Sequence, residues 1–280
     1  MRLCYIIRQP ALRISRPSRH TTQKSKPKRY PKVQAFLCNV RGSNLAPNID
    51  LRILLDLNSM VPPNSRGAIF WDFIGNNPLC RGFPIFFPVV ALWFSSDYRR
   101  RRSRMLVGLL STCVAVLLSV WIQHHINVHV RPFLDPTLHL QSTPPAWTVG
   151  LRHLNSFPSD TATLFFALTA VVFLENRMAG CIALLWSLIA ACVARVATGW
   201  HYPSDVVGGF VLGVGCVFLA TRIRPLLAFF ERRLEQWQPR IYILHAILFL
   251  FLADAYVLFA GLQSFCNVFV QMGAYLIRQL

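Results

Sequence analysis

Apolar residues occur in long runs from about residue 82 onward, and short polar or basic segments separate these runs. A helix needs about 20 mainly apolar residues to cross the hydrocarbon core of a bilayer. The pattern predicts membrane spans at about 82–96, 105–123, 161–174, 178–198, 204–221 and 241–262. We therefore expect an all-α fold, a polytopic membrane helix bundle with five to six transmembrane helices.

The membrane domain is expected to comprise residues 81–264, and the rest of the chain divides into three parts. Residues 1–47 are basic and rich in Ser and Pro. They fit a disordered basic tail, a start codon assigned too early, or an Arg-rich targeting peptide, and the sequence leaves these three open. Residues 48–80 contain short amphipathic and aromatic stretches, which predict interfacial helices. Residues 265–280 are expected to form a C-terminal amphipathic segment.

Composition supports an integral membrane protein. The 280 residues are 54% hydrophobic and 14% charged, whereas soluble domains carry about 25% charged residues. The net charge of +18 includes 11 Lys and Arg, and no acid, within residues 1–49. Elsewhere the basic residues cluster in short loops beside apolar runs, which is typical of membrane topology signals rather than of nucleic-acid binding. The scattered cysteines predict neither a metal site nor a disulfide framework.

The basic loops predict how the chain crosses the membrane. Loops at 99–104, 175–177 and 222–240 should lie on the cytoplasmic side, because Lys and Arg are retained there. The loops at 124–158 and 199–204 should then lie on the outer side. We therefore expect an integral membrane protein whose polar motifs gather at the outer face of the membrane.

Residues 195–205 bring an Arg, a His and an Asp into a segment that lies between apolar runs. His201 and Asp205 are four residues apart, which places them on one side of a helical turn. A carboxylate there can hold one imidazole nitrogen and leave the other free as a nucleophile or base. The guanidinium of Arg195 has a geometry that suits phosphate. The segment therefore predicts a phosphate-handling site.

Two upstream blocks make this interpretation more specific. Residues 124–132 read His-x6-Arg-Pro, and residues 156–163 read Ser-Phe-Pro-Ser-Asp-Thr-Ala-Thr. Together with residues 195–205, in this order, they resemble the type 2 phosphatidic acid phosphatase family, which shares its fold with the vanadium haloperoxidases. That family's pattern is Lys-x6-Arg-Pro, then Pro-Ser-Gly-His, then Ser-Arg-x5-His-x3-Asp. The resemblance covers roughly residues 80–221 and is strongest in the third block.

The resemblance implies a role for each matching residue. His201 would attack phosphorus and form a phosphohistidine, and Asp205 would orient it. Arg131 and Arg195 would bind the phosphoryl oxygens, and His124, at the position of the family's Lys, could also donate to phosphate. The Ser159 hydroxyl, with nearby backbone N–H groups, would add hydrogen-bond donors. No cofactor and no metal are implied.

Three positions depart from the family pattern. His124 stands where the family has Lys, Ala194 where it has Ser, and Thr161 where it has the His that protonates the leaving oxygen. A threonine hydroxyl cannot serve as that acid near neutral pH. Replacement acids are open, and the candidates are Asp160, His124, His125 and His153. His129, like His124 and His125, is interpreted as an interface histidine at the end of a span.

The resemblance, which extends to the Ser-Phe-Pro-Ser-Asp of bacterial members, implies a lipid phosphatase or diphosphatase of a bacterial inner membrane. Its substrate would be a phosphorylated membrane lipid, with a polyprenyl diphosphate such as undecaprenyl diphosphate favoured. Thr161 favours a diphosphate, because a phosphate leaving group needs protonation less than an alkoxide does. The alternative is a catalytically impaired relative that binds phosphorylated lipids without turnover. The expected partners are the lipid substrate and the bilayer, not nucleic acid, and the sequence contains no signal for an oligomeric state.

Overall fold

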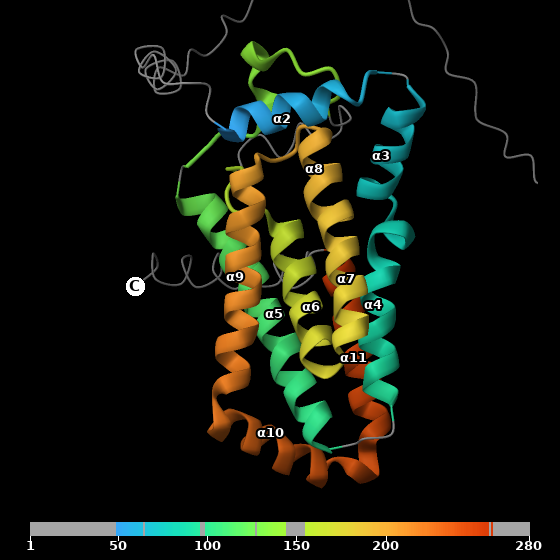
Figure 1. The fold of residues 1–280 in the computed structure, drawn as a ribbon. Helices are drawn as coiled ribbons and strands as arrows, with labels where there is room; N and C mark the ends of the chain where they lie inside the picture. The colour runs from blue at the N-terminus through green and yellow to red at the C-terminus, as the bar shows by residue number, and fades with distance from the viewer. Residues whose placement is uncertain are drawn as a thin grey trace, which may run out of the picture. The chain divides into compact units, whose positions relative to one another are not determined.

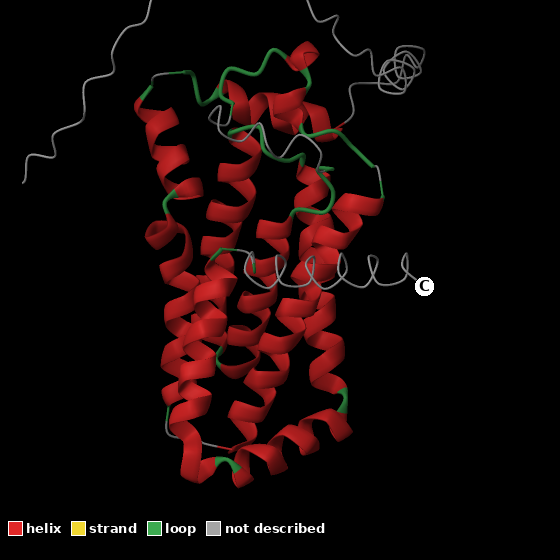
Figure 2. Cartoon of the chain, turned by 180° about the vertical axis from the view of Figure 1, so that it is seen from behind, coloured by secondary structure: helices red, strands yellow, loops and turns green. Residues whose placement is uncertain are grey.

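The computed structural model describes residues 49–63, 65–95, 99–126, 128–143, 155–257 and 259. Helices make up most of this part and no strand occurs in it (Figure 2). Five segments in it are long and apolar enough to cross a membrane: Arg66–Phe94, Arg100–His125, Arg177–Ala197, Pro203–Arg222 and Gln238–Ala255. The predicted all-α membrane helix bundle is confirmed. The expectations for residues 1–47 and 265–280 fall outside the described residues.

The first described helices lead into the bundle. Helix α2 (Ile49–Ser59) lies across one end of the bundle, and α3 (Arg66–Asn76) and α4 (Pro78–Phe94) follow (Figure 1). Asn77 separates α3 from α4, and its side-chain oxygen accepts a hydrogen bond from the backbone N–H of Cys80 at 3.0 Å. This span starts before residue 82 because an Asn cap followed by Pro is a strong signal for a helix start.

Helix α6 (Asp160–Glu175) lies at the centre of the bundle, between α5 (Arg99–His125) and α9 (Pro203–Arg222) on one side and α4 and α7 on the other (Figure 1). Eleven of its 16 residues are buried. At 1.5 Å per residue α6 is about 24 Å long, which is shorter than the hydrocarbon core of a bilayer, about 30 Å thick. It is therefore not among the five segments given above, although a span was expected at 161–174. Its apolar residues pack against neighbouring helices, so α6 is the core of the fold.

Two glycines let α9 approach α6 closely. A Cβ added to Gly209 would lie 2.6 Å from the backbone oxygen of Ser159, and one added to Gly213 would collide with the backbone oxygen of Thr163. Small residues four apart allow membrane helices to pack backbone to backbone. This contact ties the start of α6, at Ser159, to the first turns of α9.

The span before the third motif contains a π-helical stretch. Helix α7 (Arg177–Ser187) continues through the π-helix η4 (Leu188–Val193) into the short α8 (Ala194–Ala197). A π-helical turn inserts an extra residue into a helix and often occurs at functional sites. Here it directly precedes Arg195, so it changes the direction in which that side chain leaves the helix.

The opposite end of the bundle carries basic residues. Residues 222–240 were expected to be a loop, but they contain α10 (Arg224–Gln236), an amphipathic helix that crosses this end before α11 (Ile241–Tyr256) (Figure 1). At the same end Glu175, with a side chain 1% exposed, accepts hydrogen bonds from Arg104 at 2.5 and 2.9 Å. The basic loops therefore gather at one end, as the sequence predicts.

Candidate active site

The three polar blocks converge at the end of the bundle that α2 crosses. The backbone N–H of Ser159 donates to the carbonyl of Asp205 at 2.9 Å, which joins the second and third blocks. The N–H of Phe133 donates to the carbonyl of Gly199 at 3.1 Å, which joins the first and third. Gly199 has a φ of +74°, a left-handed conformation that favours glycine at this turn.

His201 lies at the centre of these blocks, and 1% of it is exposed. Its Nδ1 donates to the backbone carbonyl of Ser156 at 3.0 Å, and Oδ2 of Asp205 lies 3.6 Å from the same nitrogen. Its Nε2 accepts from Nη1 of Arg131 at 3.4 Å. Burial lowers the pKa of His201 and outweighs the opposing effect of its interaction with the Asp205 carboxylate, and the charge of Arg131 lowers the pKa further. The ring is therefore neutral near pH 7, with the lone pair of Nε2 directed at a guanidinium.

Asp205 is fully buried and makes several contacts. Its Oδ2 accepts from the backbone N–H of Tyr202 at 2.8 Å and from the hydroxyl of Ser156. Its Oδ1 lies 3.2 Å from Nδ1 of His129. A buried carboxylate is stable when each oxygen has donors. Asp205 thus closes the first turn of α9 and fixes the loop that carries His201.

Arg195 is held from three sides. Nη2 donates to the Thr161 hydroxyl at 3.1 Å, and Nη1 donates to Oδ1 of Asn76 at 3.2 Å. Its guanidinium carbon lies 4.9 Å from the ring centroid of Trp200, within cation–π distance. These contacts fix the plane of the guanidinium, as recognition of a phosphoryl group requires.

Both arginines retain donors without a protein acceptor. Among the described residues, the Nε atoms of Arg131 and Arg195 are buried and have no hydrogen-bond partner. Buried polar groups without partners are rare in proteins, and each calls for an explanation. Two guanidinium groups with donors to spare, one of them beside a neutral imidazole, fit an anion with several oxygens.

The start of α6 contains the altered acid position. The hydroxyl of Ser159 accepts from the N–H of Ala162 at 3.4 Å, so it caps the helix while its own proton can still be donated. Oδ1 of Asp160 accepts from the N–H of Thr161 at 2.7 Å, and its carboxylate interacts electrostatically with Arg131. Ser159, Asp160 and Thr161 therefore lie beside the other polar blocks, and the roles given to them stay predictions.

The structure does not bring His124 to the site. The rings of His124 and His125 are exposed, and each hydrogen-bonds through Nδ1 to a carbonyl of its own helix, four residues back. The buried neighbour Gln123 faces the site instead, and its Oε1 accepts from Nη2 of Arg131 at 3.4 Å. Alignment to the family's Lys by spacing pointed to the wrong face of α5. His153 lies outside the described residues.

Several site residues were missed by the sequence analysis. Ser156 and His129 both contact Asp205, and Asn76 contacts Arg195. Asp50 of α2 accepts from the N–H and the hydroxyl of Ser204, at 2.8 and 2.6 Å, and so ties α2 to the start of α9. For His129 and Ser156 the only available signal was proximity in sequence, to Arg131 and to Ser159 respectively. For Asn76 and Asp50 there was none.

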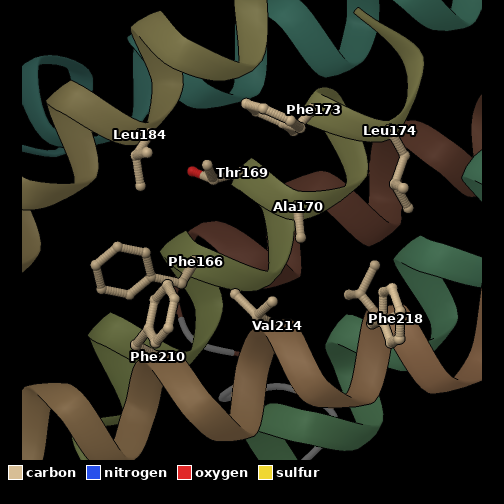
Figure 3. A pocket seen from close by; sticks show the side chains of 10 residues that line it. Phe166, Thr169, Ala170, Phe173, Leu174, Leu184, Phe210, Val214 and Phe218 are labelled. Atoms are coloured by element: carbon tan, nitrogen blue, oxygen red, sulfur yellow. The ribbon is translucent and has the colours of Figure 1, made fainter. Parts of the chain in front are cut away.

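An apolar groove runs beside the site helices. It has a volume of about 320 Å³ and is formed by α6, α7 and α9 (Figure 3). Its walls include Phe166, Phe173, Leu184, Phe210, Val214 and Phe218. The Thr169 hydroxyl in this wall is paired with Ser187 at 2.9 Å, so the lining is hydrocarbon in character. Within the described residues no cluster of His, Cys, Asp or Glu has the arrangement of a metal site.

Comparison with known proteins agrees with this geometry. Residues 104–229 match the PAP2 superfamily. This part of the chain is therefore similar to that superfamily. The match spans all three motif blocks and confirms the resemblance seen in the sequence. No solved structure matches the chain with comparable significance.

Curated relatives of the PAP2 domain come from bacteria and an archaeon. A bacitracin transport permease protein, BcrC, of Bacillus licheniformis is 36% identical over 86 residues, which cover 30% of this chain and 41% of the relative. The undecaprenyl-diphosphatase BcrC of Bacillus subtilis is 28% identical over 50% of this chain and 67% of its own length. An undecaprenyl-diphosphatase of Sulfolobus acidocaldarius is 24% identical over 64% of this chain and 80% of its own.

Proposed function

We propose that the protein hydrolyses the diphosphate of a membrane lipid, a polyprenyl diphosphate such as undecaprenyl diphosphate, through a phosphohistidine at His201. The arrangement of His201 carries this proposal. Its Nδ1 is engaged by the Ser156 carbonyl at 3.0 Å, and its Nε2 faces Arg131 at 3.4 Å. The names of the relatives support the choice of lipid.

The first step is attack by Nε2 of His201 on the terminal phosphorus. A P–N bond forms, the P–O bond to the lipid phosphate breaks, and the lipid monophosphate leaves. Arg131 and Arg195 donate hydrogen bonds to the oxygens of the transferring phosphoryl group, where they stabilise its charge. Asp205 and the Ser156 carbonyl stabilise the imidazolium that forms. Water then attacks the phosphohistidine, which releases inorganic phosphate and a proton and regenerates the imidazole.

The leaving group explains how the site can work with Thr161. The lipid monophosphate that leaves has a second pKa of about 6, so it departs as an anion without a protein acid. An alkoxide, the leaving group from a lipid monophosphate, needs a proton, and general acid catalysis typically contributes about 10²–10⁴-fold. Since Thr161 accepts a hydrogen bond from Arg195, it supports phosphate binding rather than proton transfer. A preference for diphosphates follows.

The groove between α6, α7 and α9 is proposed to hold the hydrocarbon chain of the substrate. Both α6 and α9 begin at the site, with Asp160 and Asp205 in their first turns. Phe166, which lines the groove, follows Asp160 by six residues and so lies about 9 Å further along the axis of α6. A phosphate at His201 and a chain in the groove are therefore compatible with one lipid molecule.

The membrane orientation follows from charge. The start of α5, which carries Arg101 and Arg104, and helix α10 lie at the end of the bundle opposite α2, whereas the three polar blocks converge at the α2 end. Basic loops are retained in the cytoplasm. We propose that the protein resides in a bacterial inner membrane, with the site at the outer face.

A second candidate function is binding of phosphorylated lipids without turnover. Thr161 is the observation that favours it, because this position lacks the acid of the family pattern. Both functions use the same arginines, so only turnover distinguishes them.

The test is phosphate release by the purified, detergent-solubilised protein from undecaprenyl diphosphate, with EDTA present to suppress contaminating metal phosphatases. The matched control is His201→Ala. We expect release that disappears in the control and exceeds release from phosphatidic acid. Folded protein that releases no phosphate from any lipid phosphate or diphosphate tested would overturn the proposal and favour the binding function.

A further inference from the structure

Asp205 lies between two imidazole rings. Its Oδ2 is 3.6 Å from Nδ1 of His201, while its Oδ1 is 3.2 Å from Nδ1 of His129. The carboxylate that is expected to serve the nucleophile thus lies closer to His129, which occupies a position of the first block that the family pattern leaves unspecified. The backbone N–H of His129 donates to Oδ1 of Asn155 at 3.0 Å, which fixes the position of this residue.

His129 faces two carboxylates. Asp205 approaches it from α9, and Asp50 of α2 acts on it through space. The hydrogen bond that His129 donates to Asp205 raises the pKa of His129. Partial burial lowers this pKa, and the negative charges of Asp205 and Asp50 raise it further. The neighbouring ring of Tyr202, at 5.4 Å, is neutral because burial raises the pKa of its phenol to about 12. His201 is the other titratable group on Asp205, and it is neutral.

An unbalanced Asp205 would oppose the reaction in two ways. A buried carboxylate favours the protonated form of a neighbouring imidazole, and a protonated His201 has no lone pair for attack. The same negative charge repels an incoming phosphoryl anion, and burial strengthens that repulsion. A cation beside Oδ1 of Asp205 removes both effects. It leaves Oδ2 available to accept the hydrogen bond from the N–H of Tyr202, next to His201.

We propose that His129 is a positioning residue whose imidazolium balances the charge of Asp205, so that His201 remains a neutral nucleophile and the phosphoryl anion is not repelled. This proposal rests on the proposed function. His129 acts through Asp205 and does not touch the substrate. Its side chain is 36% exposed, so it exchanges protons with water. Activity should therefore fall as the pH rises through the pKa of His129, which lies above the ordinary value of about 6.5.

Two variants separate charge from shape. His129→Arg supplies a cation that does not titrate, and His129→Gln supplies a neutral donor. For the wild type we expect kcat/KM to decline on the alkaline side, and for His129→Arg we expect this decline to disappear. For His129→Gln we expect kcat/KM near neutral pH to fall roughly 10- to 100-fold, mainly through KM, because the neutral donor keeps a hydrogen bond to Asp205 but no longer balances its charge. An unchanged alkaline decline in His129→Arg, or wild-type kinetics in His129→Gln, would overturn the proposal.

Binding of orthovanadate, a phosphate analogue, tests the same charge without turnover. The wild type should bind vanadate more weakly once the pH exceeds the pKa of His129, whereas binding by His129→Arg should not show that loss. Vanadate binding by the wild type that shows no such loss would contradict the role of His129, and this measurement needs no variant. Failure of the proposed function has a different signature: vanadate binds with the expected pH dependence, but the wild type releases no phosphate.

Discussion

Replacing Gly209 with Ala should disturb both the fold and the site, because this glycine sets the distance between α9 and α6. The new Cβ would lie 2.6 Å from the backbone oxygen of Ser159 and 2.9 Å from Cβ of Ala162. Ordinary contact begins at 3.4 Å, so the backbone of Ser159 must move by about 0.8 Å. Ser159 cannot yield by rotating a side chain, because the colliding atom belongs to the backbone.

The cost has two components. Overpacking typically costs about 1–3 kcal/mol, and the higher helix propensity of Ala returns at most about 1 kcal/mol. We expect a net loss of stability of about 1–2 kcal/mol. The same movement stretches the hydrogen bond from Ser159 to the carbonyl of Asp205, 2.9 Å in the native protein. A displacement of about 1 Å at a catalytic site can reduce the rate about 10²-fold, so turnover should fall by more than the loss of folded protein explains.

Gly215 provides the matched control on the same helix. A Cβ added there meets no atom within 4 Å, so Gly215→Ala should leave turnover unchanged and stability equal or slightly higher. The measurements are thermal unfolding in detergent and phosphate release per folded protein. Gly209→Ala with the stability and turnover of Gly215→Ala would refute this reasoning about the α6–α9 contact.

Three further changes probe other parts of the account. Thr161→His should raise turnover of a lipid monophosphate relative to a lipid diphosphate, and an unchanged ratio of the two rates would contradict the role given to the leaving group. Val214→Trp fills the groove, so it should slow cleavage of long-chain but not short-chain diphosphates; Val211→Trp, on the exposed face of α9, is its control, and equal effects of the two variants would exclude a chain site there. Because the pKa of His201 is lowered, kcat/KM should rise with pH through a value below about 6.5, and an acidic limb above that value would show that burial does not keep the ring neutral. Glu175→Gln leaves Arg101 and Arg104 without their buried partner, so the unfolding temperature should fall while the KM of folded protein is unchanged.

Five of the six predicted spans overlap the segments that can cross a membrane, because hydrophobic length is a direct physical requirement of the bilayer. The expected span at 161–174 is instead the buried core helix α6. The charge pattern also placed the segments at 99–104 and 175–177 on the same side of the membrane. In the structure they lie together, because Arg104 donates a hydrogen bond to Glu175. The expected loop at 222–240 is wrong over α10. Its Arg residues signalled topology, but its amphipathic spacing also supports an interfacial helix.

The candidate site could be predicted only where residues lie close together in sequence. His201 and Asp205 form one local segment, so their pairing follows from spacing. His124 was assigned by counting from Arg131, yet rotation of α5 places Gln123 at the site instead. The contact between His129 and Asp205 spans 76 positions, and no local pattern encodes such a distance.

The contribution of the first helices was equally inaccessible to sequence reasoning. Asn76 lies 119 positions from Arg195, and Asp50 lies 154 positions from Ser204. These residues lie outside the PAP2 domain at 104–229. Their hydrogen bonds show that α2 and α3 help to position the site, although the amphipathic pattern indicated only helices at the membrane surface.

Trapping of a phosphorylated histidine tests the central claim most directly. The protein would be mixed with a polyprenyl diphosphate labelled in its terminal phosphate and quenched in alkali, which preserves phosphohistidine, and the modified residue would be identified by mass spectrometry. The account predicts an acid-labile phosphate on His201 that appears during turnover and is absent from His201→Ala. Turnover with no phosphohistidine, or with phosphate on another residue, would contradict it.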